Sequence, residues 1–556
     1  MGVTVAPGEA RGQVLVCEEP LSFWGGVDPA TGRIVDAHHP QAGETVSDRI
    51  LLMPTTRGSC SGSGVMLDLA LTGRAPAALV FREAEEVATL GALIAGRMFD
   101  RPVPVLRLEA REYDALARAP DARIADDRIE AGDAAIPLAP LDLDAVALSA
   151  AERAMLDGRE GRAVALAMEL IRVAAALQGA RDLTQVSRVH VDGCIYAAPA
   201  FLTFAETMAG MGARVRVPTT TNAISVDREN WERQGVARAF GEPAARLADA
   251  YLAMGAEPSF TCAPYLLADA PGTGERIAWA ESNAVIFANS VLGARTVKHP
   301  DFLDLCIALT GRAPHAGVYR DADRRPRRIL EVEVPEGADD ALWPLAGWLA
   351  GRASPDRVPV LTGLEGRAPD RDALKALCAA FGTTSGAPML HVAGVTPEAG
   401  LPPADGADRA RIGPEAFRDA WSRLNGGRAE VDLVAFGSPH YSVTEARRLA
   451  RALDGRKVAK GVTALVTLGR ATLAELRADG TLDRLRSAGA TVVPDLCWCS
   501  ISEPVFPPAA RVVMTDSGKY AHYGPALSGR QVRLGALADC VAAAVTGRAP
   551  PRDWAG

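Results

Sequence analysis

The sequence predicts an α/β protein that consists of a small N-terminal unit and a larger region with several lobes. Short apolar runs, typical of buried strands, alternate with stretches of helical periodicity along most of the chain. This alternation favours largely parallel sheets covered by helices. The chain has 556 residues, of which 48% are hydrophobic and 23% are charged. That length suits several globular domains of roughly 100–200 residues each.

The N-terminal unit, residues 1–117, is predicted to be a small, strand-rich α/β domain. Its strand-like runs are residues 14–16, 50–53, 78–81 and 103–106, and residues 83–98 have helical periodicity. Residues 118–148 are rich in Ala, Asp and Pro and have weak periodicity. We therefore expect this stretch to be a connector.

The larger region, residues 149–556, is predicted to begin with a helix. Ser149 and Glu152 have the spacing of a capping box, in which each side chain accepts a hydrogen bond from the other residue's backbone N–H. Helical periodicity follows at residues 163–177 and 445–453. Strand-like runs lie at residues 189–191, 215–217, 433–436, 464–466 and 491–493. This region is therefore predicted to be α/β as well.

Charge and cysteine content exclude several classes of protein. The net charge of −8 argues against a nucleic-acid-binding surface. The chain has no run of about 18 uncharged apolar residues and no secretory signal at its start, so we expect neither a membrane span nor export. Nine scattered cysteines predict free thiols in a cytoplasmic protein. The sequence leaves open whether the protein is a monomer or a homo-oligomer.

A loop of small residues, Arg57–Gly64, lies between a predicted strand and a predicted helix. Backbone N–H groups at a helix N-terminus favour anions, and a nearby arginine suits a carboxylate. The loop lacks the Lys-Ser/Thr ending of a P-loop and does not have a Rossmann glycine pattern. It is predicted to be an anion site, and a flexible surface turn is the alternative.

Several further loops rich in small polar residues follow predicted strands. They are residues 218–222, 261–265, 281–283, 289–290 and 437–441. Ligands of open α/β sheets bind outside the carboxyl ends of the strands, where such loops lie. Although each loop alone is typical of a turn, their number predicts a shared polar pocket.

The cysteines do not have the spacing of a known metal site. The chain has no C-x-x-C pair, and Cys497-Trp498-Cys499 does not fit a zinc ribbon. Cys306, Cys378 and Cys497 lie on different segments, so only the fold can bring them together. Buried free cysteines commonly serve as small hydrophobic residues. The residues by themselves do not predict a reaction.

Long strings of the chain resemble the aconitase X family over nearly its full length. In the N-terminal unit they are residues 20–28, 38–40, 57–64 and 78–83. In the larger region they are residues 190–194, 217–220, 261–265, 281–285, 288–296, 391–398, 437–440 and 520–523. The resemblance implies a small swivel-type α/β domain fused to a large, multi-lobed, aconitase-like catalytic region.

The resemblance also implies an iron-dependent dehydratase, that is, a hydro-lyase. Fused bacterial members resemble enzymes that convert cis-3-hydroxy-L-proline, a small hydroxy amino acid, to Δ1-pyrroline-2-carboxylate, whereas two-subunit archaeal members act on phosphomevalonate. The fusion, and Ser438 where archaeal members carry Cys, favour the hydroxyproline reaction. Two alternatives stay open, namely a dehydratase of another hydroxy acid and a non-catalytic metal-binding relative.

By the same resemblance, an iron–sulfur cluster, either [2Fe–2S] or another iron centre, acts as a Lewis acid. Its implied ligands are Cys306, Cys378 and Cys497, with Cys262 as the replacement. The implied general base is Ser59 as an alkoxide-like group, with Ser63 as the alternative and Arg57 stabilising the anion. The implied substrate-binding residues are His190, Thr219, Thr220, Tyr265, Glu281, Ser282, Asn283, His440 and Lys519.

Overall fold

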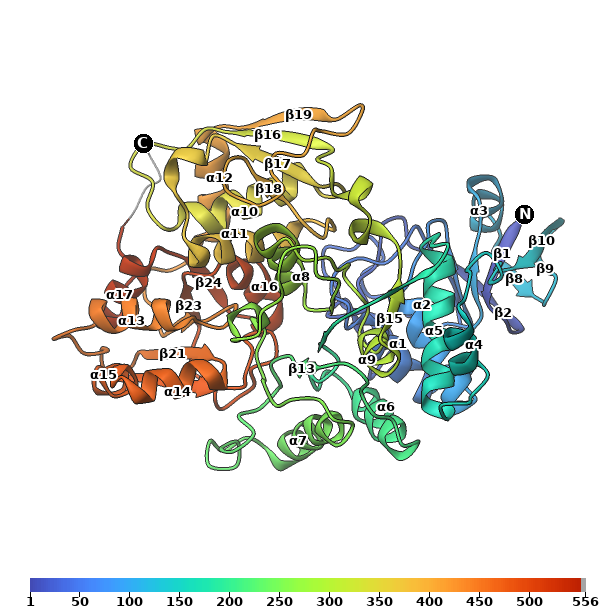
Figure 1. Ribbon diagram of the computed structural model, residues 1–556, viewed down its shortest axis with the longest axis horizontal. Coiled ribbons are helices and arrows are strands. Elements are labelled where there is room, and N and C mark those ends of the chain that lie inside the picture. The colour runs from blue at the N-terminus through green and yellow to red at the C-terminus, as the bar shows by residue number, and fades with distance from the viewer. Residues whose placement is uncertain (552–556) are drawn as a thin grey trace. The chain divides into compact units, whose positions relative to one another are not determined.

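A computed structural model describes residues 1–551, which form two compact units (Figure 1). The first unit contains residues 1–219, 249–256 and 298–317. The second contains residues 220–248, 257–297 and the chain from 318 onward. Each unit has a mixed α/β fold, as the sequence predicts. None of the helices in the described part of the chain is both long and apolar enough to span a bilayer.

The first unit begins with a closed eight-stranded barrel in the order β1-β10-β9-β8-β2-β5-β6-β7. The strands are β1 (Gly2–Ala6), β2 (Ala10–Val16), β5 (Ile50–Met53), β6 (Ala78–Phe81), β7 (Val105–Arg107), β8 (Asp121–Ile124), β9 (Arg128–Ala131) and β10 (Ala134–Pro140). All four residues of β5 and of β6 are buried, which explains their unbroken apolar sequence. Exposed and buried residues alternate in β8.

Residues 118–148, predicted to be a connector, instead contain β8, β9 and β10, which complete the barrel. Buried Ala122, Ile124, Ile129, Ala131 and Ile136 alternate with mostly polar residues and face the barrel core. Because several of these core residues are small, the period-2 signal is weak in the sequence. The physical cause of the difference is that barrel closure removes the edges that these short strands would otherwise leave unpaired.

Helices between and after the barrel strands continue the first unit. They are α1 (Gly62–Leu71), α2 (Val87–Phe99), α3 (Ala110–Ala117), α4 (Ala150–Leu156), α5 (Arg162–Leu177), α6 (Pro199–Gly210) and α9 (Leu303–Thr310). The short strands β11 (Leu183–Gln185), β12 (Val189–Val191) and β15 (Arg312–Pro314) accompany them. The predicted capping box of α4 is confirmed, because Glu152 N–H donates to Ser149 Oγ at 3.3 Å and Ser149 N–H donates to Glu152 Oε2 at 2.7 Å.

The second unit contains a four-stranded parallel sheet in the order β18-β17-β16-β19. Its strands are β16 (Arg328–Val332), β17 (Pro359–Thr362), β18 (His391–Val392) and β19 (Asp408–Ile412). Helices α10 (Leu342–Ala353), α11 (Arg371–Thr384) and α12 (Pro414–Leu424) pack with the apolar residues of this sheet. On the exposed face, Arg409 and Arg411 pair with Glu331 and Glu333.

The second unit also contains a five-stranded parallel sheet in the order β22-β21-β20-β23-β24. Its strands are β20 (Leu433–Phe436), β21 (Thr463–Leu468), β22 (Ala490–Pro494), β23 (Val512–Thr515) and β24 (Gln531–Leu534). One face packs with α13 (Val443–Ala452), α14 (Arg470–Ala478), α15 (Thr481–Ser487) and α17 (Leu537–Thr546), and the other packs with α16 (Gly518–Ser528). The strand order reverses between β20 and β23, which makes this the topological switch point.

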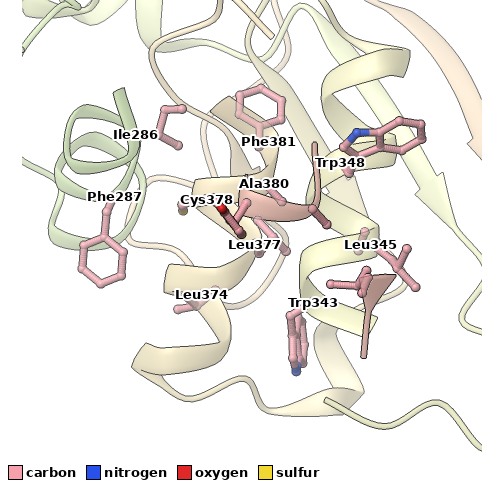
Figure 2. Close-up of a cluster of buried hydrophobic side chains, with 14 of the residues drawn as sticks. Ile286, Phe287, Trp343, Leu345, Trp348, Leu374, Leu377, Cys378, Ala380 and Phe381 are labelled. Atoms are coloured by element: carbon pink, nitrogen blue, oxygen red, sulfur yellow. The ribbon is translucent and has the colours of Figure 1, made fainter. Parts of the chain in front are cut away.

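The core of the second unit is tightest where α10 crosses α11. Figure 2 shows Trp343, Leu345 and Trp348 of α10 beside Leu377 and Phe381 of α11. Gly347 lies at the crossing, where a Cβ atom would lie 2.1 Å from the backbone carbonyl oxygen of Leu377. The two helices therefore approach each other as closely as they do because residue 347 has no side chain.

We predict that Gly347→Ala lowers the free energy of unfolding by about 1–3 kcal/mol, because the added methyl group overpacks a backbone contact that cannot move aside. Chemical denaturation measures the change. Gly400→Ala is the matched control, because no atom lies within 4 Å of its added Cβ. Equal stability of the two variants would contradict the proposed close approach.

Candidate active site

In the first unit, the loop between β5 and α1 carries the predicted base. Ser59 is half-buried, and its hydroxyl lies 3.4 Å from the hydroxyl of Ser61. Ser63, inside α1, is fully buried, and its Oγ lies within hydrogen-bond distance of the carbonyl oxygens of Cys60 and Asp301, at 2.9 and 3.0 Å. The predicted strand–loop–helix order is confirmed, and Ser59 is the more accessible of the two candidate bases.

Arg57 of the same loop forms two ion pairs. Its guanidinium group lies 3.0 Å from Asp36 and 3.5 Å from Glu19. Although partial burial opposes the effect, hydrogen bonds from His38 N–H and Arg57 hold the pKa of Asp36 below its ordinary value. The charge of Arg57 is therefore shared with two carboxylates of the first unit.

Behind this loop lies a buried group of acidic and thiol side chains. The ligand atoms of Cys60, Asp192 and Asp301 lie within 4.8 Å of one another, which is a spacing that could hold a metal ion. Burial and the carboxylates of Asp192 and Asp304 raise the pKa of Asp301 well above its ordinary value. At neutral pH this environment favours either a bound cation or a protonated carboxyl group.

Three other predicted site residues also belong to the first unit. His190 of β12 is fully buried, and the hydroxyl of Thr219 donates to the carbonyl oxygen of Val217 at 2.8 Å. Cys306 is fully buried in α9. Burial and the nearby Asp304 carboxylate raise the pKa of the Cys306 thiol above its ordinary range.

In the second unit, a buried ion pair forms the centre of the predicted pocket. Lys519 Nζ, in the first turn of α16, lies 2.6 Å from Glu281 Oε1. The two residues are only 5% and 7% exposed. Burial disfavours both charges, but each partner offsets this penalty, so the pKa of Glu281 lies below and the pKa of Lys519 lies above its ordinary value. The pair is therefore ionised at neutral pH.

A hydrogen-bond network extends from Glu281. Asn283 Nδ2 donates to Glu281 Oε1 at 2.7 Å and lies 3.0 Å from the carbonyl oxygen of Cys262. The hydroxyl of Tyr265 donates to Asn283 Oδ1 at 2.8 Å, and Asn222 Nδ2 reaches Glu281 Oε2 at 3.5 Å. The structure therefore brings together four predicted residues, Tyr265, Glu281, Asn283 and Lys519.

Three thiols gather beside this network. Cys262 and Cys497 are buried together, and the half-buried Cys499 packs against them. Cys499 N–H donates to Cys497 Sγ at 3.4 Å. The hydrogen bond with Cys262 and burial raise the pKa of Cys497 above its ordinary range, and the ammonium group of Lys519 opposes this rise only in part. Soft sulfur ligands of this kind suit iron.

The loop that carries Cys497 and Cys499 follows β22 and is held by specific contacts. Arg470 of α14 forms two hydrogen bonds with Asp495, at 2.8 and 2.6 Å. The indole N–H of Trp498 donates to the carbonyl oxygen of Phe436 at 2.9 Å. These contacts hold the chain just before Cys497 and again between the two thiols.

The backbone of His440 contacts the thiol cluster, and its imidazole ring contacts two neighbouring loops. Its N–H donates to Cys262 Sγ at 3.3 Å. Its ring nitrogens contact Leu496 O at 2.6 Å and Thr261 Oγ1 at 3.2 Å. Burial lowers the pKa of His440 to about 4, so the ring is neutral at pH 7.

The remaining predicted residues of the second unit lie in different surroundings. Cys378 lies among the apolar side chains of α11 (Figure 2). Ser282 is the first residue of α8 (Ser282–Phe287), and Thr220 is half-buried next to Asn222. Nothing in the sequence singles out Cys499 or Asn222 as an individual site residue. Cys499 was discounted on its spacing to Cys497, although a turn brings both thiols to one place.

Comparison with known proteins identifies the family. Residues 1–131 match the aconitase X swivel domain, and residues 145–322, 326–422 and 431–546 match its first, second and third domains. The chain is 50% identical over 560 residues to cis-3-hydroxy-L-proline dehydratase of Pseudomonas aeruginosa, covering 98% of this chain and 96% of that protein. The chain belongs to the aconitase X family.

Further relatives define its chemistry as that of a dehydratase, a hydro-lyase. Cis-3-hydroxy-L-proline dehydratase of Hypocrea jecorina is 44% identical over 98% of this chain and 95% of that protein. The phosphomevalonate dehydratase large subunit of Methanocaldococcus jannaschii is 30% identical over 70% of this chain and 97% of its own length. The holo-form crystal structure of Thermococcus kodakaraensis aconitase X is 28% identical, covers 72% of this chain and all of that chain, and has a TM-score of 0.66.

We predict that Lys519→Met lowers the free energy of unfolding by about 3–5 kcal/mol at pH 8, because Glu281 is left as a buried carboxylate without its cation. The pKa of Glu281 then rises above its unfolded value, so the loss is smaller at pH 5, where this carboxyl group takes up a proton more readily. Chemical denaturation at both pH values measures the effect.

The double variant Lys519→Met with Glu281→Gln is the control for this prediction. It removes both charges, so we expect it to recover most of the lost stability and to lose the added pH dependence. A double variant as unstable as Lys519→Met alone would show that the ion pair is not the cause.

Proposed function

We propose that this dehydratase eliminates water from cis-3-hydroxy-L-proline to give Δ1-pyrroline-2-carboxylate. The observation that carries the proposal is the identity of 50% and 44% to two proteins of that name over nearly the whole of both chains. The phosphomevalonate dehydratase large subunits are about 30% identical and cover only about 70% of this chain. The single chain, with its own barrel domain, resembles the former group in organisation.

The buried charges of the second unit match the charges of this substrate. A hydroxyproline is a zwitterion, with a carboxylate and a secondary ammonium group. Lys519 provides a cation for the carboxylate, and Glu281 provides an anion for the ammonium group. Asn283 and Tyr265 hold Glu281 in place, so the two charges are oriented before substrate binds. The other predicted substrate contacts, namely His190, Thr219, Thr220, Ser282 and His440, stay predictions.

Ser59 is the proposed general base for the Cα proton. It is half-buried, whereas Ser63 is fully buried beside backbone carbonyl oxygens. The serine anion requires stabilisation, which the backbone N–H groups at the start of α1 supply. The N–H of Ser61 lies 3.3 Å from Ser59 Oγ. Arg57 adds positive charge to this loop. Its ion pairs with Asp36 and Glu19 reduce the effect of that charge.

The thiols of Cys262, Cys497 and Cys499 are the proposed ligands of an iron centre. They fit this group because they lie in one small cluster of soft sulfur ligands, in which Cys262 and Cys497 are buried and Cys499 is half-buried. Hydrogen bonds between the thiols and burial raise the pKa of Cys497 and Cys499, and the Lys519 ammonium opposes this rise, which assists the loss of the thiol protons that metal binding requires. When bound, an iron centre with an open position supplies a Lewis acid for the departing hydroxyl group. Cys306 and Cys378 stay predicted ligands, and the same metal analysis tests them.

The proposed reaction predicts that anaerobically purified protein converts cis-3-hydroxy-L-proline to the imine product in proportion to its iron content. After the Cα proton and the C3 hydroxide leave, the resulting enamine tautomerises to the cyclic imine. Trapping the imine, with iron and sulfide measured in the same sample, is the experiment. Turnover of phosphomevalonate instead would overturn the proposed substrate assignment. Turnover by iron-free protein would overturn the proposed need for iron.

A Ser59→Ala variant tests whether Ser59 is the general base. We expect kcat to fall by about 10²–10⁴-fold with iron content unchanged, because only the proton acceptor is removed. Ser487→Ala, at an exposed position of α15, is the matched variant and keeps its activity. Full activity of Ser59→Ala would assign the base to another residue.

Removal of one thiol tests the metal ligands. We predict that Cys497→Ser lowers iron affinity by about tenfold or more, since a soft ligand is replaced by a hydroxyl group. Iron content and visible absorption of the purified variant measure the change. Cys540→Ser, at a buried position of α17 outside the thiol cluster, is the control and keeps its iron. Unchanged iron in Cys497→Ser would remove Cys497 from the ligand set.

A further inference from the structure

A cavity of about 440 Å³ lies in the second unit at the carboxyl edge of the five-stranded sheet. It is lined by the loops that follow β20, β23 and β24 and by the first residues of α10 and α11. This is the switch point between β20 and β23, where open α/β sheets bind ligands. Its volume falls within the range of small-molecule sites.

The cavity is separate from the candidate active site. Its lining includes none of Glu281, Asn283, Tyr265 or the three clustered thiols. The loop after β20 contributes to both places, because Ser438 lines the cavity and His440 N–H donates to Cys262 Sγ. Gly437 allows the tight turn between strand and loop, since a Cβ there would lie 2.1 Å from the carbonyl oxygen of Thr467.

The wall of the cavity has an excess of acidic side chains. Its carboxyl groups belong to Asp339, Asp340, Asp370, Asp372, Glu445 and Asp516, and its basic groups belong to Arg367, Lys375 and Arg448. Two of these three basic groups are already neutralised, because Lys375 pairs with Glu445 and Arg448 pairs with Asp370. Beside these two pairs, the wall holds four further carboxyl groups and only one further basic group, Arg367, so it stays acidic.

Of these acidic residues, Asp516 gives the clearest evidence of the excess negative charge. Its carboxylate accepts a hydrogen bond from the hydroxyl of Tyr441 and forms no ion pair within the described residues. The hydroxyl of Ser438 is also buried, and it has no hydrogen-bond partner in the part of the chain that the structure describes. The Asp516 carboxyl group and the Ser438 hydroxyl group thus belong to the same wall, which Trp343 also lines.

We propose that this cavity binds a small organic cation, namely a compound with ammonium or guanidinium groups on a short carbon chain. A charged nitrogen donates to Asp516, and the carbon chain packs on Trp343 and Tyr441, whose rings also favour a cation. A bare metal ion fits less well, because these carboxyl groups do not have metal-ligand spacing. Among the described residues, only Cys60, Asp192 and Asp301 have it.

The ionisation of Asp516 supports this assignment. Burial, together with Glu445 of α13 and Asp340 before α10, raises the pKa of Asp516 to about 7, whereas the hydroxyl of Tyr441 and Lys375 of α11 lower it. Cys540 of α17 faces the same carboxylate as an uncharged thiol. A bound cation stabilises the ionised form of Asp516, so binding is expected to be tighter at pH 8 than at pH 6.

The test compares three five-carbon probes by calorimetry on the full-length protein at pH 8. They are 1,5-diaminopentane, pentane-1,5-diol and glutarate, which match in length and differ in charge. We expect the diamine to bind at least about tenfold more tightly than the diol, and glutarate not to bind. Equal binding of the diamine and the diol, or no binding of the diamine, would overturn the proposal.

Variants locate the binding site. Asp516→Asn keeps an acceptor for Tyr441 and removes the charge, so we expect diamine affinity to fall about tenfold. Asp340→Asn, on the same wall, weakens binding independently if the first variant does not fold. Asp419→Asn, at an exposed position of α12, is the control and leaves affinity unchanged. Diamine binding that survives both cavity substitutions would place the diamine elsewhere and contradict the proposal.

Discussion

The buried ion pair between Lys519 and Glu281 is the interaction on which the candidate site of the second unit depends. Each charge is stable in its buried place because the other is present. Glu281 in turn accepts a hydrogen bond from the side chain of Asn283. Asn283 also contacts the hydroxyl of Tyr265 and the backbone carbonyl oxygen of Cys262. The same ammonium group opposes the rise in the pKa of Cys497 and Cys499 that hydrogen bonds between the thiols and burial cause. One pair therefore links the polar network with the sulfur cluster.

The doubly wound sheet explains why these groups meet. Parallel strands direct their carboxyl ends to one edge, so loops that are distant in the sequence become neighbours there. The loop after β20 brings His440, the loop after β22 brings Cys497 and Cys499, and the helix after β23 brings Lys519. On the side of β23 and β24, the same edge forms the acidic cavity beside Asp516.

The first unit presents a different electrostatic environment around its serine loop. The N-terminus of α1 provides N–H groups, but Cys60, Asp192 and Asp301 lie directly behind it. Burial and the carboxylates of Asp301 and Asp192 raise the pKa of the Cys60 thiol, and burial and Asp192 raise the pKa of Asp301, which the hydrogen bond with Cys60 lowers in part. A serine anion at Ser59 therefore needs the helix N-terminus and Arg57 to outweigh nearby carboxyl groups, unless these are protonated.

Local signals in the sequence determined many of the strands and helices of this protein and its family. The apolar runs at 433–436, 464–466 and 491–493 predicted strands that the sheet contains, and the Ser149–Glu152 spacing predicted a capping box that is present. Matching strings determined the family, because long identical segments preserve chemistry as well as fold. The strands of residues 121–140 were not predicted, since several of their core residues are small and the barrel that buries them closes only through pairing with the distant strands β1 and β2.

Only the tertiary structure decided which of the singled-out residues meet. Nothing in the spacing of Cys262, Cys497 and Cys499 distinguishes them from the other six cysteines, because a thiol cluster depends on loops that converge at a sheet edge. The burial of Ser63 beside backbone carbonyl oxygens, and the accessibility of Ser59, also follow from packing rather than from the loop sequence. Sequence determines which chemical groups are available, and long-range packing determines their distances, burial and charge states.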